Sequence, residues 1–200
     1  MYSMHNGGSI EVFKQIAQRV NPKTVVEVGT YYGGITKQLS ELLPYSHFFA
    51  VQAYNDSKLN HMPDTARGEY SQGNAEENID PKLKNKDWKR SVKKYFPEEY
   101  HDYYDFNLLA ATFQDSDNVT LILDTSPFKY DWKIGFDLVI FDISPEIQEN
   151  IRQFDYWKKY GNKDSYILMG AYTHQKEFFE YAAVEYSVEL IGKDYVLVRL

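Results

Sequence analysis

The chain has 200 residues, 43% of them hydrophobic and 26% charged, which suits the core of one domain and leaves no room for a second full-sized one. Its formal net charge is −7 without a basic cluster, which argues against nucleic acid and membrane surfaces as partners. The absence of cysteine excludes disulfides, thiolate nucleophiles and cysteine-ligated zinc. Without a membrane-length apolar run or a signal-peptide pattern, we expect a cytoplasmic protein.

The first elements in chain order predict a βαβ unit. Apolar residues at helical spacing indicate a first helix, with Ser9 as its N-cap and Asn21-Pro22 at its end. A strand is expected at Thr24–Val28, followed by a glycine-rich turn and a helix that Pro44 ends. The apolar run at residues 47–51 predicts a second strand, parallel to the first.

The next segment, at about residues 53–105, is polar, charged and rich in tyrosine. Insertions of this length between core elements are usually lids or binding loops. A solvated linker would not be expected to carry so many aromatic residues: Trp88, Tyr95, Phe96, Tyr100, Tyr103 and Tyr104. We therefore expect a lid-like insertion that covers a ligand pocket, and a homodimer interface is the alternative use of these side chains.

The second half alternates strands and helices. Strands are expected at Val119–Leu123, Phe136–Phe141 and residues 165–169. One helix is expected to start at Ser144-Pro145-Glu146, with Ser144 as N-cap, Pro145 at the first helical position and Ile147, Ile151 and Phe154 on its buried face, and another over residues 174–183. Two further strand-like runs around Gly192 predict a β-hairpin. Together the elements predict one α/β domain over residues 1–200, with a doubly wound, mostly parallel Rossmann-like sheet and an antiparallel C-terminal hairpin at its edge.

The turn after the first strand, Gly29-Thr30-Tyr31-Tyr32-Gly33-Gly34, is the main candidate for a ligand site. Open α/β sheets bind ligands at the carboxyl ends of their strands, where the strand order reverses. Glycine allows positive φ and close approach, and the following helix offers free N–H groups. A phosphate-binding loop would need a lysine after its glycines, and a dinucleotide site would need glycine where Tyr31 stands. The alternative is a tight turn without a ligand.

The segment Glu27-Val28-Gly29-Thr30-Tyr31-Tyr32-Gly33 resembles motif I, E/D-x-G-x-x-x-G, of the class I S-adenosylmethionine-dependent methyltransferases. It is especially similar to the small-molecule branch that includes macrocin O-methyltransferase-like and cephalosporin-hydroxylase-like proteins. The order of the other elements, including the terminal hairpin, also resembles this family over most of the chain. The resemblance implies a class I methyltransferase fold, S-adenosylmethionine as cofactor and a small-molecule acceptor.

The resemblance also implies roles for individual residues. Glu27, Gly29, Thr30, Tyr31 and Gly33 would hold the methionine part of the cofactor, with Glu27 fixing the turn and the amino group. Gln52 stands where most members have an acid for the ribose, and Asp56 is a nearby substitute. The chain after the third strand, including Asp124 and Thr125, would lie around the adenine; the alternative for Asp124 is a strand-end cap.

For catalysis, the resemblance points to the ends of the fourth and fifth strands. Asp142 stands where related metal-dependent enzymes bind a divalent cation, but no carboxylate follows the fifth strand at residues 169–172. A single carboxylate is a poor magnesium site, so we expect a metal-independent enzyme. His174 is the best-placed general base, and a surface histidine at a helix start is the alternative.

The sequence therefore predicts an S-adenosylmethionine-dependent methyltransferase that acts on a small molecule. Two other functions stay open. The first is a catalytically silent binding protein with the methyltransferase fold, which Gln52 and the absence of a clear base keep possible. The second is a dinucleotide-binding oxidoreductase, against which the bulk of Tyr31 argues.

Overall fold

The structure is a computed structural model that describes residues 7–30, 33–52, 112–113, 115–123, 126–128, 131–141, 146–171 and 174–200. Several features predicted above lie outside the described residues: the insertion at about 53–105, Tyr31, Asp124, Thr125, Asp142, and Ser144 and Pro145 of the predicted helix start. Their predicted roles therefore stay predictions.

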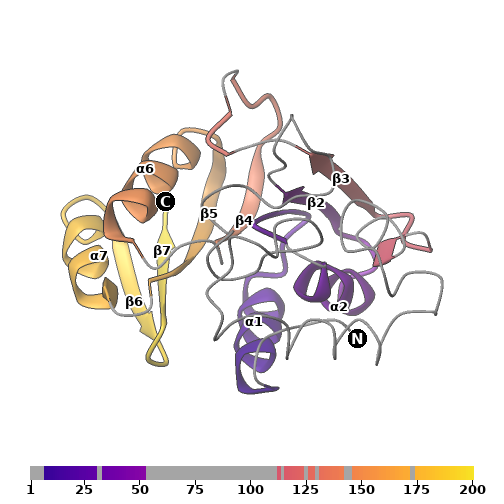
Figure 1. The fold of residues 1–200 in the computed structure, drawn as a ribbon, viewed down its shortest axis with the longest axis horizontal. Helices are drawn as coiled ribbons and strands as arrows, with labels where there is room; N and C mark the ends of the chain where they lie inside the picture. Colours follow the sequence, from indigo (N-terminus) through magenta and orange to yellow (C-terminus); the bar gives the residue numbers. More distant parts are fainter. Residues whose placement is uncertain are drawn as a thin grey trace, which may run out of the picture.

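Helices and strands alternate along the described part of the chain, as Figure 1 shows. The elements are, in order, α1 (Gly7–Val20), β1 (Thr24–Val28), α2 (Gly34–Leu42), β2 (His47–Gln52), β3 (Val119–Leu123), β4 (Phe136–Phe141), α6 (Ile147–Trp157), β5 (Gly161–Gly170), α7 (Gln175–Ala182), β6 (Ser187–Ile191) and β7 (Tyr195–Arg199).

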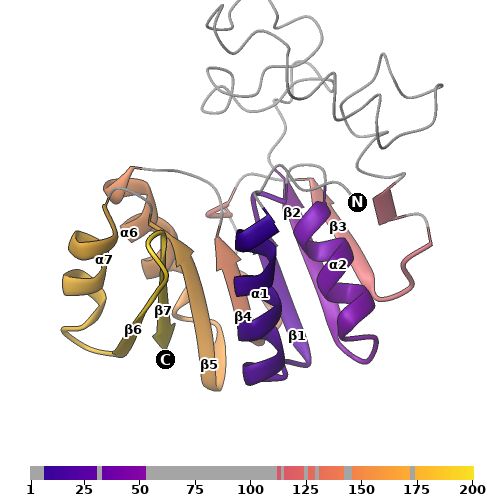
Figure 2. The same cartoon turned by 90° about the horizontal axis from the view of Figure 1, so that it is seen from below.

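The strands form one sheet in the order β3-β2-β1-β4-β5-β7-β6. Strand β1 pairs in parallel with β2 on one side and with β4 on the other, so the strand order reverses between β1 and β4. Strand β7 runs antiparallel to both β5 and β6, and Figure 2 shows it pointing opposite to β4 and β5. The predicted fold class is confirmed, including the antiparallel hairpin at the edge.

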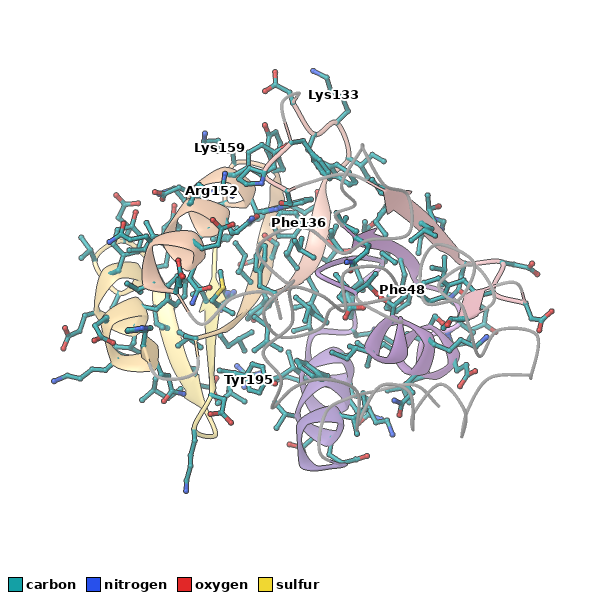
Figure 3. The ribbon with its side chains drawn as sticks, in the orientation of Figure 1. Phe48, Lys133, Phe136, Arg152, Lys159 and Tyr195 are labelled. Atoms are coloured by element: carbon teal, nitrogen blue, oxygen red, sulfur yellow. The ribbon has the colours of Figure 1, made fainter. Side chains whose placement is uncertain are left out.

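Helices cover both faces of the sheet. Helices α1 and α2 pack on one face, where Phe13, Ile35 and Leu39 contact strand residues such as Phe48 and Tyr195, both labelled in Figure 3. Helices α6 and α7 pack on the opposite face. Because both faces are covered, β4 is apolar along nearly its whole length, as the sequence predicted for a central parallel strand.

The face covered by α6 has an aromatic core centred on Trp157, which is fully buried. Two of its neighbours, Phe128 and Trp132, come from the connection between β3 and β4 rather than from a helix or strand. Their ring centroids lie 5.8 and 5.2 Å from that of Trp157. The connection is thus tied to α6 by packing, beside the carboxyl end of β3.

Three predicted boundaries are wrong. Helix α1 begins at Gly7, so Ser9 lies in its first turn and is not the N-cap. Helix α6 begins only at Ile147, because Glu146 at φ −84° and ψ 125° is extended and itself takes the N-cap position. Strand β5 begins earlier than expected, at Gly161, which pairs with Phe136 across an irregular register. Each difference reflects local backbone geometry that apolar periodicity does not encode.

The buried face of α6 follows the predicted one only in part. Phe154 is buried, but Ile147 and Ile151 are only partly buried at the margin of the core. The most buried residues of this helix include two amides, Asn150 and Gln153, next to Phe154 and Trp157.

Candidate functional site

The turn after β1 lies where the strand order reverses, as the sequence predicted. Gly29 and Gly33 have positive φ angles of 84° and 77°, which glycine adopts without the steric cost of a Cβ atom. The backbone N–H groups of Gly29 and Thr30 both donate to the Val51 carbonyl of β2, over 2.9 and 3.1 Å. The Gly33 N–H donates to the Thr30 carbonyl over 2.7 Å. The turn therefore satisfies these donors within the protein.

Glu27 holds this turn against the start of α2. Its side chain is buried at the end of β1, and its Oε2 atom accepts hydrogen bonds from Thr30 Oγ1 at 2.9 Å and from the Thr36 backbone N–H at 3.0 Å. The hydroxyl group of Thr36 donates to the same oxygen. Glu27 thus fixes the turn, while its predicted contact with the amino group of a ligand stays a prediction.

Thr36 is a site residue that the sequence reasoning missed. It supplies two hydrogen bonds to Glu27 from the first turn of α2 and is almost completely buried. A signal was present, because a threonine in the first turn of a helix has a side chain and a backbone N–H that point toward the preceding strand end. Thr36 lies nine residues after Glu27, which is the separation expected when a short turn is followed directly by the first residues of a helix.

Phe113 is a second residue that the sequence did not predict at the turn. A Cβ atom on Gly33 would meet the Phe113 ring at 2.3 Å, so the ring packs directly against this glycine. Phe113 is buried and also contacts Ala50 of β2. Gly33 is therefore required twice, by its positive φ angle and by the space that the ring occupies.

These contacts decide what kind of group the turn favours. Phosphate-binding turns offer backbone N–H groups to an anion. Here the N–H groups of Gly29, Thr30, Gly33 and Thr36 are directed to protein oxygens, and the last of these belongs to the buried carboxyl group of Glu27. An acid beneath the turn repels a phosphate and attracts a cation. Among its described residues, the turn therefore favours a cationic or zwitterionic ligand.

The end of β2 adds an amide to the same edge of the sheet. Gln52 is the last residue of β2, is 5% exposed, and lies opposite Leu123 at the end of β3. An amide both donates and accepts, which suits a pair of hydroxyl groups. Asp124 and Thr125 follow Leu123 in the sequence and are outside the described residues.

His174 stands at the end of β5, on the other side of β4. It is the N-cap residue of α7, its backbone N–H donates to the Ala171 carbonyl over 2.7 Å, and its side chain is 37% exposed. Its Nδ1 atom lies 3.6 Å from Glu177 Oε2. Two strand spacings, roughly 10 Å, separate the ends of β1 and β5. His174 thus lies at the carboxyl end of the parallel strands, on the same edge of the sheet as the glycine turn but two strands away from it.

The described residues contain no group of three or more histidine and acidic side chains placed to hold a metal ion. Asp142 is not among these residues, so its predicted place next to the end of β4 stays untested. None of the helices in the described ranges is both long and apolar enough to cross a membrane.

Comparison with solved structures of the same architecture identifies the fold. Precorrin-6y C5,15-methyltransferase from Geobacter metallireducens GS-15 superposes with a TM-score of 0.61 at 12% identity, over 98% of this chain and 89% of that one. A caffeoyl-CoA O-methyltransferase-like protein from Staphylococcus aureus gives a TM-score of 0.60 at 10% identity, over 99% and 85%. The chain has the class I methyltransferase fold.

The O-methyltransferase from Bacillus cereus in complex with SAH has the same class I methyltransferase fold, with a TM-score of 0.58 at 11% identity over 100% of this chain and 84% of that one. No protein-family model and no curated protein matches the sequence. At these identities, the likeness establishes the class I methyltransferase fold of the chain and nothing narrower.

Proposed function

We propose that this protein is an S-adenosylmethionine-dependent methyltransferase that acts on a small-molecule acceptor. The observation that carries the proposal is the buried Glu27 carboxyl group beneath the turn, together with the N–H groups of Gly29, Thr30, Gly33 and Thr36, which donate to protein oxygens. S-adenosylmethionine suits such a turn because it carries a sulfonium cation and an amino group and has no phosphate. A dinucleotide would bring its pyrophosphate to the same place, against the acid.

The comparisons support the choice of cofactor. Among the structures with this fold, the O-methyltransferase TomG from Streptomyces achromogenes was solved in complex with SAM and the Bacillus cereus enzyme in complex with SAH. In our proposal, Glu27, Gly29, Thr30, Tyr31 and Gly33 hold the methionine part of the cofactor. Gln52 binds the ribose, and Asp124 and Thr125 lie at the adenine.

The bound cofactor would supply an activated methyl group, so the protein has to orient the acceptor and exclude water. Alignment of two reactants is worth about 7–11 kcal/mol. We propose that His174 takes the proton from an acceptor hydroxyl group whose oxygen would receive the methyl group; the sulfur–methyl bond would break and S-adenosylhomocysteine would leave as a neutral thioether. Because Nδ1 faces Glu177, the proton would go to Nε2. Asp142 is proposed to orient the acceptor from the neighbouring strand end, without a metal ion.

Three broader features belong to the same proposal. The insertion at about residues 53–105 acts as a lid over the acceptor, and Phe113 supports this because it lies eight residues after the insertion and packs on Gly33 of the turn. The net charge of −7 supports an acceptor other than nucleic acid. A cytoplasmic location and a homodimer complete the proposal.

Isothermal titration tests the choice of cofactor. The purified chain should bind S-adenosylhomocysteine at micromolar concentration and bind NAD far more weakly. Gly29→Ala should abolish binding, because φ of 84° strains alanine and shifts the turn. Gly192→Ala is the matched control for cofactor binding: it strains a glycine at φ 61° in the β6–β7 hairpin, where a Cβ atom meets nothing within 4 Å, and β7 lies three strands from β1 in the sheet.

Tight binding of NAD without binding of S-adenosylhomocysteine would overturn the proposal. Binding of S-adenosylhomocysteine without methyl transfer to any hydroxylated or amino acceptor would instead favour a catalytically silent member of the fold. Full activity after treatment with EDTA is expected, and loss of activity that magnesium restores would show that a metal ion binds.

A further inference from the structure

The inner face of α6 carries amides where packing alone favours apolar residues. Gln153 is 1% exposed and Asn150 is fully buried, on the same face as Phe154 and Trp157. A buried amide is costly unless its donors and acceptors are satisfied, and an apolar side chain avoids that cost. The position of Gln153 therefore calls for a reason beyond the stability of the core.

Gln153 makes three hydrogen bonds, and two of them go to one residue of another segment. Its Nε2 atom donates to the Ser126 backbone carbonyl at 2.7 Å, and its Oε1 atom accepts from the Ser126 hydroxyl group at 2.6 Å. With its second N–H group, Nε2 also donates a hydrogen bond to Glu149 Oε1 at 2.6 Å. Rotation of the amide by 180° would set its oxygen against a carbonyl and a carboxylate, so only one orientation satisfies the group.

Trp157, one turn further along α6, completes the contact. Its Nε1 atom donates to the Ser126 hydroxyl oxygen at 2.9 Å. The indole is fully buried among aromatic rings, including those of Phe128 and Trp132. The hydroxyl group of Ser126 thus has both a fixed acceptor and a fixed donor, each on a rigid helix. We call Ser126, Gln153 and Trp157 the α6 clamp.

Glu149 supports the clamp from the outer side of α6. Burial raises the pKa of Glu149, but hydrogen bonds from Arg152 and Gln153 outweigh burial and hold that pKa below its ordinary value. Arg152, labelled in Figure 3, contacts the carboxylate through two atoms at 2.8 Å each. The charged carboxylate in turn fixes the Nε2 atom of Gln153.

The clamp acts on the chain directly after β3. Ser126 is three residues beyond Leu123, which pairs with Gln52 at the cofactor edge of the sheet. Gln153 and Trp157 come from α6, the helix that follows β4. The clamp therefore links the chain after β3, at the proposed cofactor site, to the elements after β4, at the proposed acceptor site. Asn150 extends the link, since its Nδ2 atom lies 3.4 Å from the Gly170 carbonyl at the end of β5.

We infer that Gln153 and Trp157 are positioning residues for recognition of the cofactor's base. They fix both the backbone and the side chain of Ser126, three positions after the end of β3. This inference rests on the proposed function, in which the chain after β3 lies at the adenine. The clamp is expected to govern the choice between adenine and other purines, and to leave the methionine end of the site unaffected.

The test compares two ligands on the full chain by isothermal titration: S-adenosylhomocysteine and its analogue with hypoxanthine in place of adenine. The measured quantity is the selectivity ratio, the dissociation constant of the hypoxanthine analogue divided by that of S-adenosylhomocysteine, which is large when the protein prefers adenine. Trp157→Phe keeps an aromatic ring but removes the hydrogen bond to Ser126 together with part of the indole packing, a loss that the core control below accounts for. Gln153→Leu removes the other two bonds to Ser126. Each variant should lower this ratio by about three- to tenfold, the change in affinity expected when a ligand contact worth about one hydrogen bond is lost.

Two controls separate positioning from general destabilisation. Phe178→Leu disturbs the same core from α7, without contact to Ser126. Ser165→Ala removes a buried hydroxyl group from β5 that has no hydrogen-bond partner among the described residues. Both controls should leave the selectivity ratio unchanged, even where the melting temperature falls.

The outcomes distinguish the inference from the proposed function. If the wild-type chain binds neither ligand, the proposed function fails and the inference with it. If the wild-type chain prefers the adenosyl ligand and Trp157→Phe keeps that preference, the inference alone is wrong. The same holds if Phe178→Leu lowers the ratio as much as the clamp variants do. Should Gln153→Leu fail to fold, the milder Trp157→Phe still decides.

Discussion

The turn after β1 and the α6 clamp lie at the same edge of the sheet, but their hydrogen bonds join residues at very different separations in the sequence. In the turn, Glu27 bonds to Thr30 and Thr36, three and nine residues away in sequence. In the clamp, Gln153 and Trp157 bond to Ser126 across 27 and 31 residues. The bonds of Glu27 are local to one segment, although Val51 and Phe113 also hold the turn from outside it, while the clamp consists entirely of contacts between distant segments.

This difference predicts how each part fails. A change in the turn should disturb the segment that contains it, together with the binding of the methionine end. A change in the clamp should leave that turn intact and alter the choice of base. Four changes test this comparison, and they are taken from the largest expected effect to the smallest.

Gly33→Ala should have the largest effect. At φ 77° an alanine costs about 1–2 kcal/mol, and its Cβ atom would lie 2.3 Å from the Phe113 ring, which adds an overpacking cost of about 1–3 kcal/mol. Chemical denaturation should show a loss near the sum of the two. Phe113→Leu in the same chain should recover part of it, and failure to recover any would show that the ring is not the obstacle.

Glu27→Gln should follow, with a loss of about 1–3 kcal/mol in the free energy of unfolding, since an amide cannot replace a carboxylate that accepts from two hydroxyl groups and one N–H. Thr36→Val is the matched, smaller change, because it removes one of these hydroxyl groups and keeps the N–H. Affinity for S-adenosylhomocysteine should fall with little change in base selectivity. A change in selectivity would contradict the separation of turn and clamp.

The loss of folding stability at acidic pH should depend on Glu149. Its pKa in the folded chain is below the ordinary value of 4.5, so its contribution is complete above that pH and is lost as the pH falls through 4.5 and then through the folded value. Thermal unfolding followed from neutral pH downward should therefore show a weaker acid dependence for Glu149→Gln than for wild type. Equal slopes in the two proteins would show that the carboxylate does not support the clamp.

Arg19→Ala should have the smallest effect. Arg19 on α1 pairs with Glu189 on β6 through atoms 2.6 Å apart, but both side chains are about half exposed. Such a pair contributes about 0.2–1 kcal/mol, and salt weakens it further. Denaturation in low and high salt should show a small difference that vanishes in high salt. Neither cofactor affinity nor base selectivity should change, so this variant sets the baseline for the other three.

The fold and the turn were predictable from the sequence because their signals are local or periodic. The apolar run of β4 marked a central strand, and the runs on either side of Gly192 marked the hairpin. The position of Glu27 just before Gly29 marked the ligand edge, which lies where the strand order reverses. Sequence alone therefore determined the order of the elements, the sheet type and the place of the glycine turn in the sheet.

Tertiary structure alone decided which polar residues serve the site from a distance. Gln153 and Asn150 interrupt an otherwise amphipathic helix, and nothing local distinguishes them from solvent-facing amides until the sheet brings Ser126 and Gly170 to them. Phe113 reaches Gly33 in the same way, across 80 residues. The physical reason is that a hydrogen bond or a ring contact is fixed by position in space, and strand pairing sets that position only after the chain has folded.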